Sequence, residues 1–178
     1  SIDADTSTSG PRKTALAEEV KKARFDQDNV ASLISDTFSI LQSGAQLHLE
    51  DIEKATEIMI DSVEKNPDVN LWLTHIKRFD FYIYSDALSS SVLASAMGIQ
   101  LGLPVKQIQH LAVGTMLMDC GKTKLAKELL HKKERLTNEE WELMKSHVSL
   151  GLSQLSKTPR VASEVLDIIR THHERLDG

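Results

Sequence analysis

The sequence predicts an all-α fold, and three observations support this prediction. Apolar residues recur at steps of three and four residues along nearly the whole chain, which is the period of an amphipathic helix. The alternating pattern of a half-buried strand is absent, apart from a trace in the first few residues. Helix start signals precede several of the periodic segments, including Pro67, Pro104 and the pair formed by Thr137 and Glu140.

The first predicted helix covers residues 14–42 and ends at the turn sequence Ser-Gly-Ala-Gln. A second predicted helix over 49–65 repeats the same period and stops at an Asn-Pro pair. The proline of this pair, Pro67, can occupy the first turn of a third helix over 67–79, because no backbone hydrogen bond is needed from its nitrogen there.

The second half of the chain continues in helices. We expect them over 82–101, 104–119, 136–155 and 159–173, with a short helix and loop over 122–136. Pro104 begins the segment that follows a Gly-Leu-Pro turn. Thr137 is followed three residues later by Glu140, which is the spacing of a capping box at a helix start.

Length and composition exclude several classes of protein. The chain has 178 residues, of which 40% are hydrophobic and 26% charged, as expected for one globular domain. Its net charge of -5 and lack of a basic block argue against binding to a DNA or RNA duplex. No apolar run is long enough to span a membrane and no signal peptide opens the chain. The single cysteine, Cys120, fits a reducing compartment and is predicted to be a packing residue. We therefore expect a cytoplasmic protein.

Asp119 is the most unusual residue of the sequence Leu-Met-Asp-Cys-Gly-Lys. It ends an apolar predicted helix, although the C-terminus of a helix favours cations over carboxylates. A buried carboxylate needs a partner, which a metal ion or Lys122 would supply. The alternative is that Asp119 merely ends the helix and faces water.

Three histidines are candidate metal ligands. His147 lies on a predicted helix, where a lone histidine is usually structural. His172 and His173 point about 100° apart if helical, so that one can face the core while the other reaches its edge. With Glu174 and Asp177 they place four potential ligands in six residues, although a solvated helix end has the same composition.

Asp119 and these histidines are spread over three predicted helices of one bundle. Facing helices of a bundle commonly build metal sites in this way. Imidazole and carboxylate ligands without a thiolate suit iron, manganese or zinc.

The order of these motifs resembles a known family. "GTMLMDCGKTKLAKELLHKKERLTNEEWELMKSHVSLGLSQL", followed by "IIRTHHERLDG", resembles the HD-GYP subgroup of the HD-domain metal-dependent phosphohydrolases. Upstream, "NPDVNLWLTHIKRFDFYIYSDALSSSVLASAMGIQLGLP" is similar to the helices that precede the His-Asp motif in members with a small N-terminal domain. The resemblance covers about residues 12–178.

The resemblance implies a domain organisation and a fold. Residues 1–12 would be the linker or tail of an N-terminal domain, and 13–66 an N-terminal helical segment. Residues 67–178 would be an HD-GYP-like domain that stops before the Gly-Tyr-Pro motif. The implied architecture is an HD-type bundle of about seven helices, with the N-terminal helices packed alongside.

The resemblance also implies a chemistry. The family hydrolyses the bacterial second messenger cyclic di-GMP with a two- or three-metal centre, often of iron or manganese. Asp119 would bridge two metals, and Lys122 would contact the substrate phosphate, so both are implied to be catalytic. The other implied site residues are the metal ligands His147, His172 and His173 and the substrate-binding Arg175.

The sequence departs from the family pattern where ligands are expected. The histidine that should precede Asp119 is Met118, whose thioether is too soft and weak a ligand to replace imidazole on a hard metal. An earlier family histidine falls on Asp86, which can bind iron or manganese but is shorter and charged. The glutamate of three-metal members falls on Tyr82, so we expect no third metal.

Three hypotheses remain open. The first is a degenerate HD-GYP domain with weak or lost activity and a binding or signalling role. The second is an active cyclic di-GMP phosphodiesterase that uses Asp86 as a substitute metal ligand. The third is an unrelated helical protein with chance motifs. The expected cofactor is a divalent metal, iron or manganese, if the site is functional, and none otherwise. The expected partners are cyclic di-GMP or a related nucleotide and a bacterial signalling protein.

Overall fold

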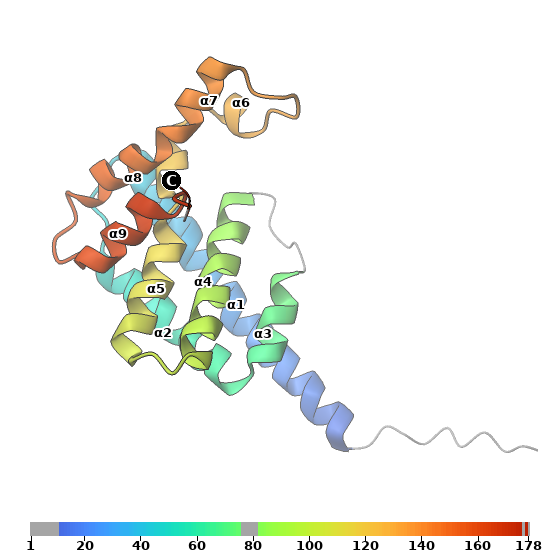
Figure 1. Cartoon of the computed structure of the whole chain (residues 1–178). Coiled ribbons are helices and arrows are strands. Elements are labelled where there is room, and N and C mark those ends of the chain that lie inside the picture. The colour runs from blue at the N-terminus through green and yellow to red at the C-terminus, as the bar shows by residue number, and fades with distance from the viewer. Residues whose placement is uncertain (1–10, 76–81, 176, 178) are drawn as a thin grey trace, which may run out of the picture.

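The computed structural model describes residues 11–75, 82–175 and 177, and these residues form helices and turns without any strand (Figure 1). The predicted all-α fold is therefore confirmed. The elements are α1 (Pro11–Ser43), α2 (Leu49–Lys65), α3 (Pro67–Thr74), α4 (Tyr82–Gln100), α5 (Val105–Leu117), the 3-10 helix η1 (Cys120–Lys124), α6 (Lys127–Leu130), α7 (Asn138–Lys145), α8 (His147–Leu155) and α9 (Ser163–Thr171).

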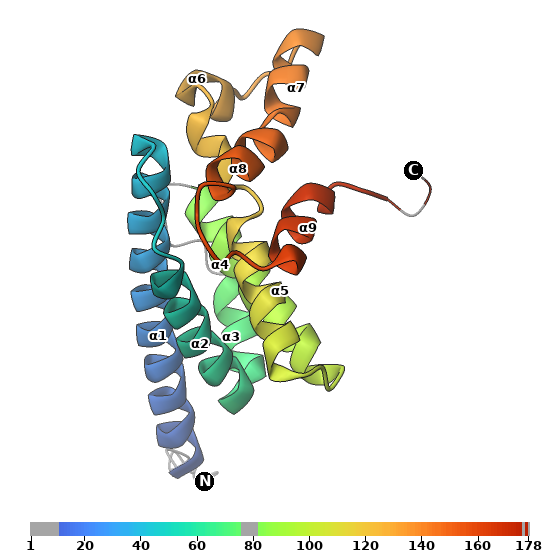
Figure 2. The same ribbon diagram turned by 90° about the vertical axis from the view of Figure 1, so that its left-hand side faces the viewer.

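The helices form a bundle around α4 and α5. Helices α1 and α2 run antiparallel along one side, as Figure 2 shows, and both contact α4. Helix α9 packs on α5 and α8, while α6 and α7 project from one end of the bundle (Figures 1 and 2). Among the described residues, no helix is both long enough and apolar enough to cross a lipid bilayer.

One hydrophobic core joins the N-terminal helices to the rest of the bundle. Phe38 of α1, Met59 of α2, Met116 and Leu117 of α5 and Ile169 of α9 are almost fully buried in it. Each such side chain contributes about 1.5–3 kcal/mol by leaving water. The last two buried residues of α5 therefore fix the position of the segment that follows, which carries Asp119.

The helix predicted over 136–155 is in fact two helices. Its start is confirmed, because Thr137 accepts a hydrogen bond from the Glu140 amide and Glu140 accepts one from the Thr137 amide. The break falls at Ser146, whose hydroxyl donates to the Leu143 carbonyl. His147 consequently becomes the first residue of α8.

The last predicted helix starts later than expected. Residues 159–162 are not helical, and Arg160 among them has a positive φ of 66° and pairs with Glu50, at 2.7 Å from Nη2 to Oε1. A left-handed residue cannot continue a helix, so α9 begins at Ser163. The strand trace in residues 1–10 and the end of the helix predicted over 67–79 lie outside the described residues.

Two glycines permit the close contacts that position α8 and α9. A Cβ atom on Gly121 of η1 would lie 1.9 Å from the His147 carbonyl oxygen, and one on Gly114 of α5 would lie 2.6 Å from Ile168 Cδ1. Real side chains do not approach so closely, and only glycine fits both places. Backbone contact between η1 and α8 brings Asp119 near His147.

Replacement of Gly121 tests this contact. We expect Gly121→Ala to lower the free energy of unfolding by about 3 kcal/mol, because the new methyl group forces η1 away from α8. Ser153→Ala, on an exposed position of α8, should change it by less than about 0.5 kcal/mol. Urea denaturation measures both variants, and equal stability of the two would show that the backbones are not in contact.

Candidate metal centre

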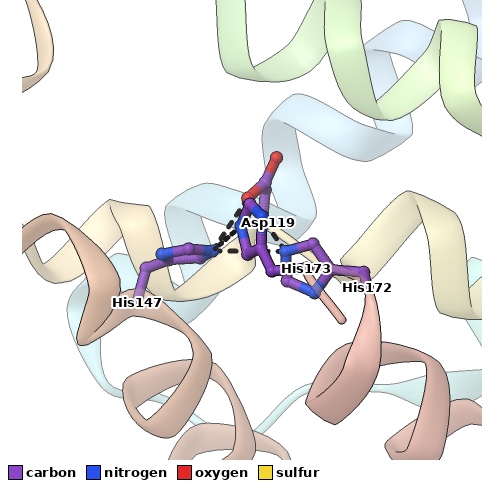
Figure 3. A group of neighbouring side chains, drawn as sticks. All are labelled: Asp119, His147, His172 and His173. Carbon is purple, nitrogen blue, oxygen red and sulfur yellow. Dashed lines mark hydrogen bonds and ion pairs between the residues drawn. The ribbon is translucent and has the colours of Figure 1, made fainter. Parts of the chain in front are cut away.

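Four side chains from three elements converge at one end of α5. Asp119 directly precedes η1, His147 is the first residue of α8, and His172 and His173 directly follow α9. Each offers one ligand atom, and these atoms all lie within 4.8 Å of one another. Figure 3 shows the three rings gathered around one oxygen of the carboxylate.

The distances within this group are short. Oδ1 of Asp119 lies 3.2 Å from Nε2 of His147 and 3.7 Å from Nε2 of His172. Nε2 of His147 lies 3.3 Å from Nε2 of His172 and 3.2 Å from Nε2 of His173. The Lys122 ammonium nitrogen lies 2.9 Å from the same carboxylate oxygen. The inner side of the group is enclosed, since the His147 side chain is only 3% exposed and that of Asp119 15%, whereas His173 is exposed at its outer side.

Backbone carbonyls set the orientation of two rings. Nδ1 of His147 lies 2.7 Å from the Met144 carbonyl oxygen, and Nδ1 of His172 lies 2.9 Å from that of Ile169. A carbonyl only accepts, so each Nδ1 is the protonated donor, and Nε2 of the neutral ring keeps its lone pair. The lone pairs face the centre of the group. A second ring nitrogen bonded to a carbonyl is also the usual support of metal-binding histidines.

This donor set fits a divalent metal ion. The Nε2 atoms of the neutral His147 and His172 rings lie 3.3 Å apart, and their lone pairs repel unless a cation lies between them. Two ligands bonded at about 2.0–2.2 Å to one ion are separated by about 3.0–3.5 Å, which matches the nitrogen spacing. In addition, Oδ1 of Asp119 is buried, and its ion-pair contact with the Lys122 ammonium at 2.9 Å does not have hydrogen-bond geometry. The four side chains could therefore hold a metal.

The charges of the group also suit a metal. Burial alone would raise the pKa of Asp119, but His147, His172 and the Lys122 ammonium together hold it well below its usual range. Burial, followed by the neighbouring His172 and His147 rings, lowers the pKa of His173. Near neutral pH the carboxylate is thus ionised and the His173 ring neutral, which are the forms that bind metal ions.

The other predicted site residues lie outside the group of four. Lys122 is at its edge, beside Asp119. Asp86 is exposed on α4 and is not among the side chains whose ligand atoms converge. Met118 packs against the hydrophobic core, and Arg175 is exposed beyond α9.

Cys120 is a packing residue, as predicted. It is fully buried, and burial together with the Asp119 charge raises the pKa of its thiol to about 12. A protonated and inaccessible thiol is not a nucleophile.

Sequence reasoning missed the carbonyl supports of the rings. In both cases the histidine lies three residues after the carbonyl that it contacts, at a helix end. A histidine just beyond the last residue of a helix could have indicated such a contact with a carbonyl. The sequence did not give the helix boundaries accurately enough to recognise this position.

Comparison with known proteins assigns the chain to a family. The family model described as HD domain matches residues 39–178, which is most of the chain. This chain belongs to the HD domain family. No solved structure matches the chain significantly.

Curated relatives of this HD domain are cyclic dinucleotide phosphodiesterases by name. The cyclic di-GMP phosphodiesterase PA4108 of Pseudomonas aeruginosa is 27% identical over 94% of this chain. A 3'3'-cGAMP-specific phosphodiesterase of Vibrio cholerae is 33% identical over 43% of the chain, and a cyclic di-GMP phosphodiesterase of Thermotoga maritima 31% over 48%. The chain spans 41%, 15% and 24% of the lengths of these relatives, respectively. The predicted HD-superfamily domain related to cyclic di-GMP phosphodiesterases is confirmed.

Removal of the carboxylate charge tests the metal centre. We expect Asp119→Asn to weaken binding of Mn²⁺ at least about 100-fold, since a direct ligand matters more than the residues that support it. Asp167→Asn, on the exposed face of α9, is the matched control and should bind Mn²⁺ like the unaltered protein. Isothermal titration calorimetry measures the affinities. Unchanged affinity in Asp119→Asn would rule out this carboxylate as a ligand.

Proposed function

We propose that this HD domain is a degenerate relative of the cyclic di-GMP phosphodiesterases, which binds a divalent metal and a cyclic dinucleotide but hydrolyses the nucleotide weakly or not at all. One observation carries the proposal. Asp119 and the three histidines converge as a ligand set, whereas the partly buried Met118 packs against the core and Asp86 lies outside the set.

The proposed ion is Fe²⁺ or Mn²⁺, which accept nitrogen and carboxylate oxygen ligands. When bound, such an ion supplies Lewis-acid stabilisation of charge on a phosphoryl oxygen. The protein's own part is to hold the ligands: the Met144 and Ile169 carbonyls fix the ring orientations, and α5 fixes Asp119.

Nucleotide binding would use the positive charge at the edge of the centre. The Lys122 ammonium, 2.9 Å from Asp119, is close enough to pair with a phosphate that approaches the metal. Arg175 is exposed just beyond the histidine pair and can reach a second phosphate or a base edge. Both contacts are available without a second metal.

Hydrolysis is expected to be weak for a chemical reason. Two-metal hydrolases stabilise both the attacking and the leaving oxygen of the phosphodiester. In this chain the thioether of Met118 replaces an imidazole and contacts apolar neighbours. With this ligand missing, binding of the nucleotide can persist while turnover is lost. A domain with these properties would serve as a cytoplasmic signalling module with a protein partner.

Measurements of cyclic di-GMP binding and hydrolysis, with added Mn²⁺ or Fe²⁺, distinguish the proposed binding function from that of an active phosphodiesterase. We expect the unaltered protein to bind the nucleotide but to hydrolyse it no more than about tenfold faster than Asp119→Ala. Chromatography of the products measures hydrolysis, and calorimetry measures binding. Asp167→Ala serves as the control for an unrelated aspartate.

The active-enzyme hypothesis makes the opposite prediction. If Asp86 substituted for the missing histidine, then Asp119→Ala and Asp86→Ala would each reduce turnover by about 100-fold or more. That result would overturn the proposed loss of activity.

A further inference from the structure

We infer that a small cleft beside Lys122 is the subsite for one base of the bound nucleotide, with Tyr84 as the stacking surface and Lys127 as the residue that favours guanine. The inference rests on the nucleotide binding of the proposed function, and adds which residues receive the base.

The cleft lies where four elements meet. Its walls combine apolar and polar side chains from the end of α1, the start of α4, η1 and α6, among them Gln42, Ile83, Tyr84, Lys122, Lys127 and Leu130. Its volume of about 80 Å³ admits the edge of one base but not a whole nucleotide. Apolar walls with a few polar groups at the rim are typical of sites that bind small organic molecules.

Lys122 connects this cleft to the candidate metal centre. Its ammonium nitrogen lies 2.9 Å from Oδ1 of Asp119, and the same side chain lines the cleft. A phosphate that pairs with this ammonium therefore lies at the mouth of the cleft. Because a single sugar separates the base of a nucleotide from its phosphate, the base is within reach of the cleft.

The charges around the cleft suit an anionic ligand. Lys122 and Lys127 line it, and no carboxylate of the described residues does. This is not a consequence of composition, since the chain has 26 acidic and 21 basic residues. A nucleotide brings negative phosphates to the cleft, and the two ammonium groups attract them.

The larger cleft between α2, α5 and the start of α9 has a different character. Its volume is about 460 Å³, but three glutamates, Glu53, Glu57 and Glu164, line it beside Lys106 and Arg160. The carboxylates offset the basic side chains there, so this cleft has no excess of positive charge for a dinucleotide.

Tyr84 supplies an aromatic surface for stacking. Its ring is partly buried, and its centroid lies 5.5 Å from that of the buried Phe38 ring, with 67° between the two planes. This edge-to-face contact holds the Tyr84 ring in place. Stacking on an aromatic side chain is the usual way in which proteins hold an unpaired base.

Lys127 gives the cleft a preference between bases. Its ammonium group only donates hydrogen bonds, and its side chain is exposed on α6. Guanine presents two acceptors, O6 and N7, on one edge, whereas adenine presents N7 beside a donating amino group. A donor at the rim of the cleft therefore favours guanine.

Substitution of Lys127 tests this preference. With Mn²⁺ present, we expect the full chain to bind cyclic di-GMP at least about tenfold more tightly than cyclic di-AMP. Lys127→Met should weaken binding of cyclic di-GMP about tenfold and leave that of cyclic di-AMP nearly unchanged. Isothermal titration calorimetry measures both nucleotides.

Lys54→Met, on an exposed position of α2, is the matched control and should bind both nucleotides like the unaltered protein. Equal affinities of the unaltered protein for the two nucleotides would overturn the guanine contact. Equal weakening of both by Lys127→Met would also overturn it, because the lysine would then act only through its charge.

Two substitutions of Tyr84 test the stacking. Tyr84→Leu should lower the affinity for cyclic di-GMP at least about tenfold, whereas Tyr84→Phe keeps the ring and should retain the affinity. Both variants should bind Mn²⁺ like the unaltered protein when nucleotide is absent. Unchanged nucleotide affinity in Tyr84→Leu would overturn the stacking role, and so would a parallel loss of Mn²⁺ binding, which would indicate a structural effect on the centre.

The results separate this subsite from the proposed function. Binding of cyclic di-GMP that is insensitive to substitution of Tyr84 and Lys127 would refute the subsite and retain the function. Rapid hydrolysis together with sensitivity to both substitutions would refute the proposed loss of activity and retain the subsite. Absence of nucleotide binding by the unaltered protein would refute both.

Discussion

The candidate metal centre depends most on the convergence of three imidazole rings on one carboxylate, that of Asp119. Nε2 of His147 lies 3.3 Å from Nε2 of His172 and 3.2 Å from that of His173, beside Asp119, and backbone carbonyls hold Nδ1 of His147 and of His172. A divalent cation held between these donors would replace the repulsion between the facing lone pairs of His147 and His172 with attraction. The same geometry would be difficult to explain as a solvated helix end.

The fold supplies this geometry through packing rather than through the ligands themselves. Buried side chains of α5 extend to the residue before Met118, so the position of Asp119 is decided by the core. Gly121 then allows α8 to approach η1 at backbone contact, and Gly114 allows the Ile168 side chain of α9 to pack directly on α5. Because three separate helix ends meet there, small changes in helix packing would move ligands that are distant in sequence.

Much of this could be predicted from the sequence, because helical periodicity and caps are local. The all-α class and the Thr137–Glu140 capping box were predicted correctly, and the four residues that converge were all among the candidates. The break at Ser146 was missed because the apolar period continues across it from α7 into α8, so that the sequence pattern gives no signal there. The exposed position of Asp86 could not be predicted either, since periodicity alone does not give the rotation of α4 relative to the centre.

A crystal structure of the Mn²⁺-loaded protein, with anomalous diffraction at the manganese absorption edge, tests the central claim most directly. The account predicts an anomalous peak within about 2.0–2.3 Å of a carboxylate oxygen of Asp119 and of Nε2 atoms of the three histidines. A map without a peak at this position, or with the four side chains directed to separate surfaces, would contradict it.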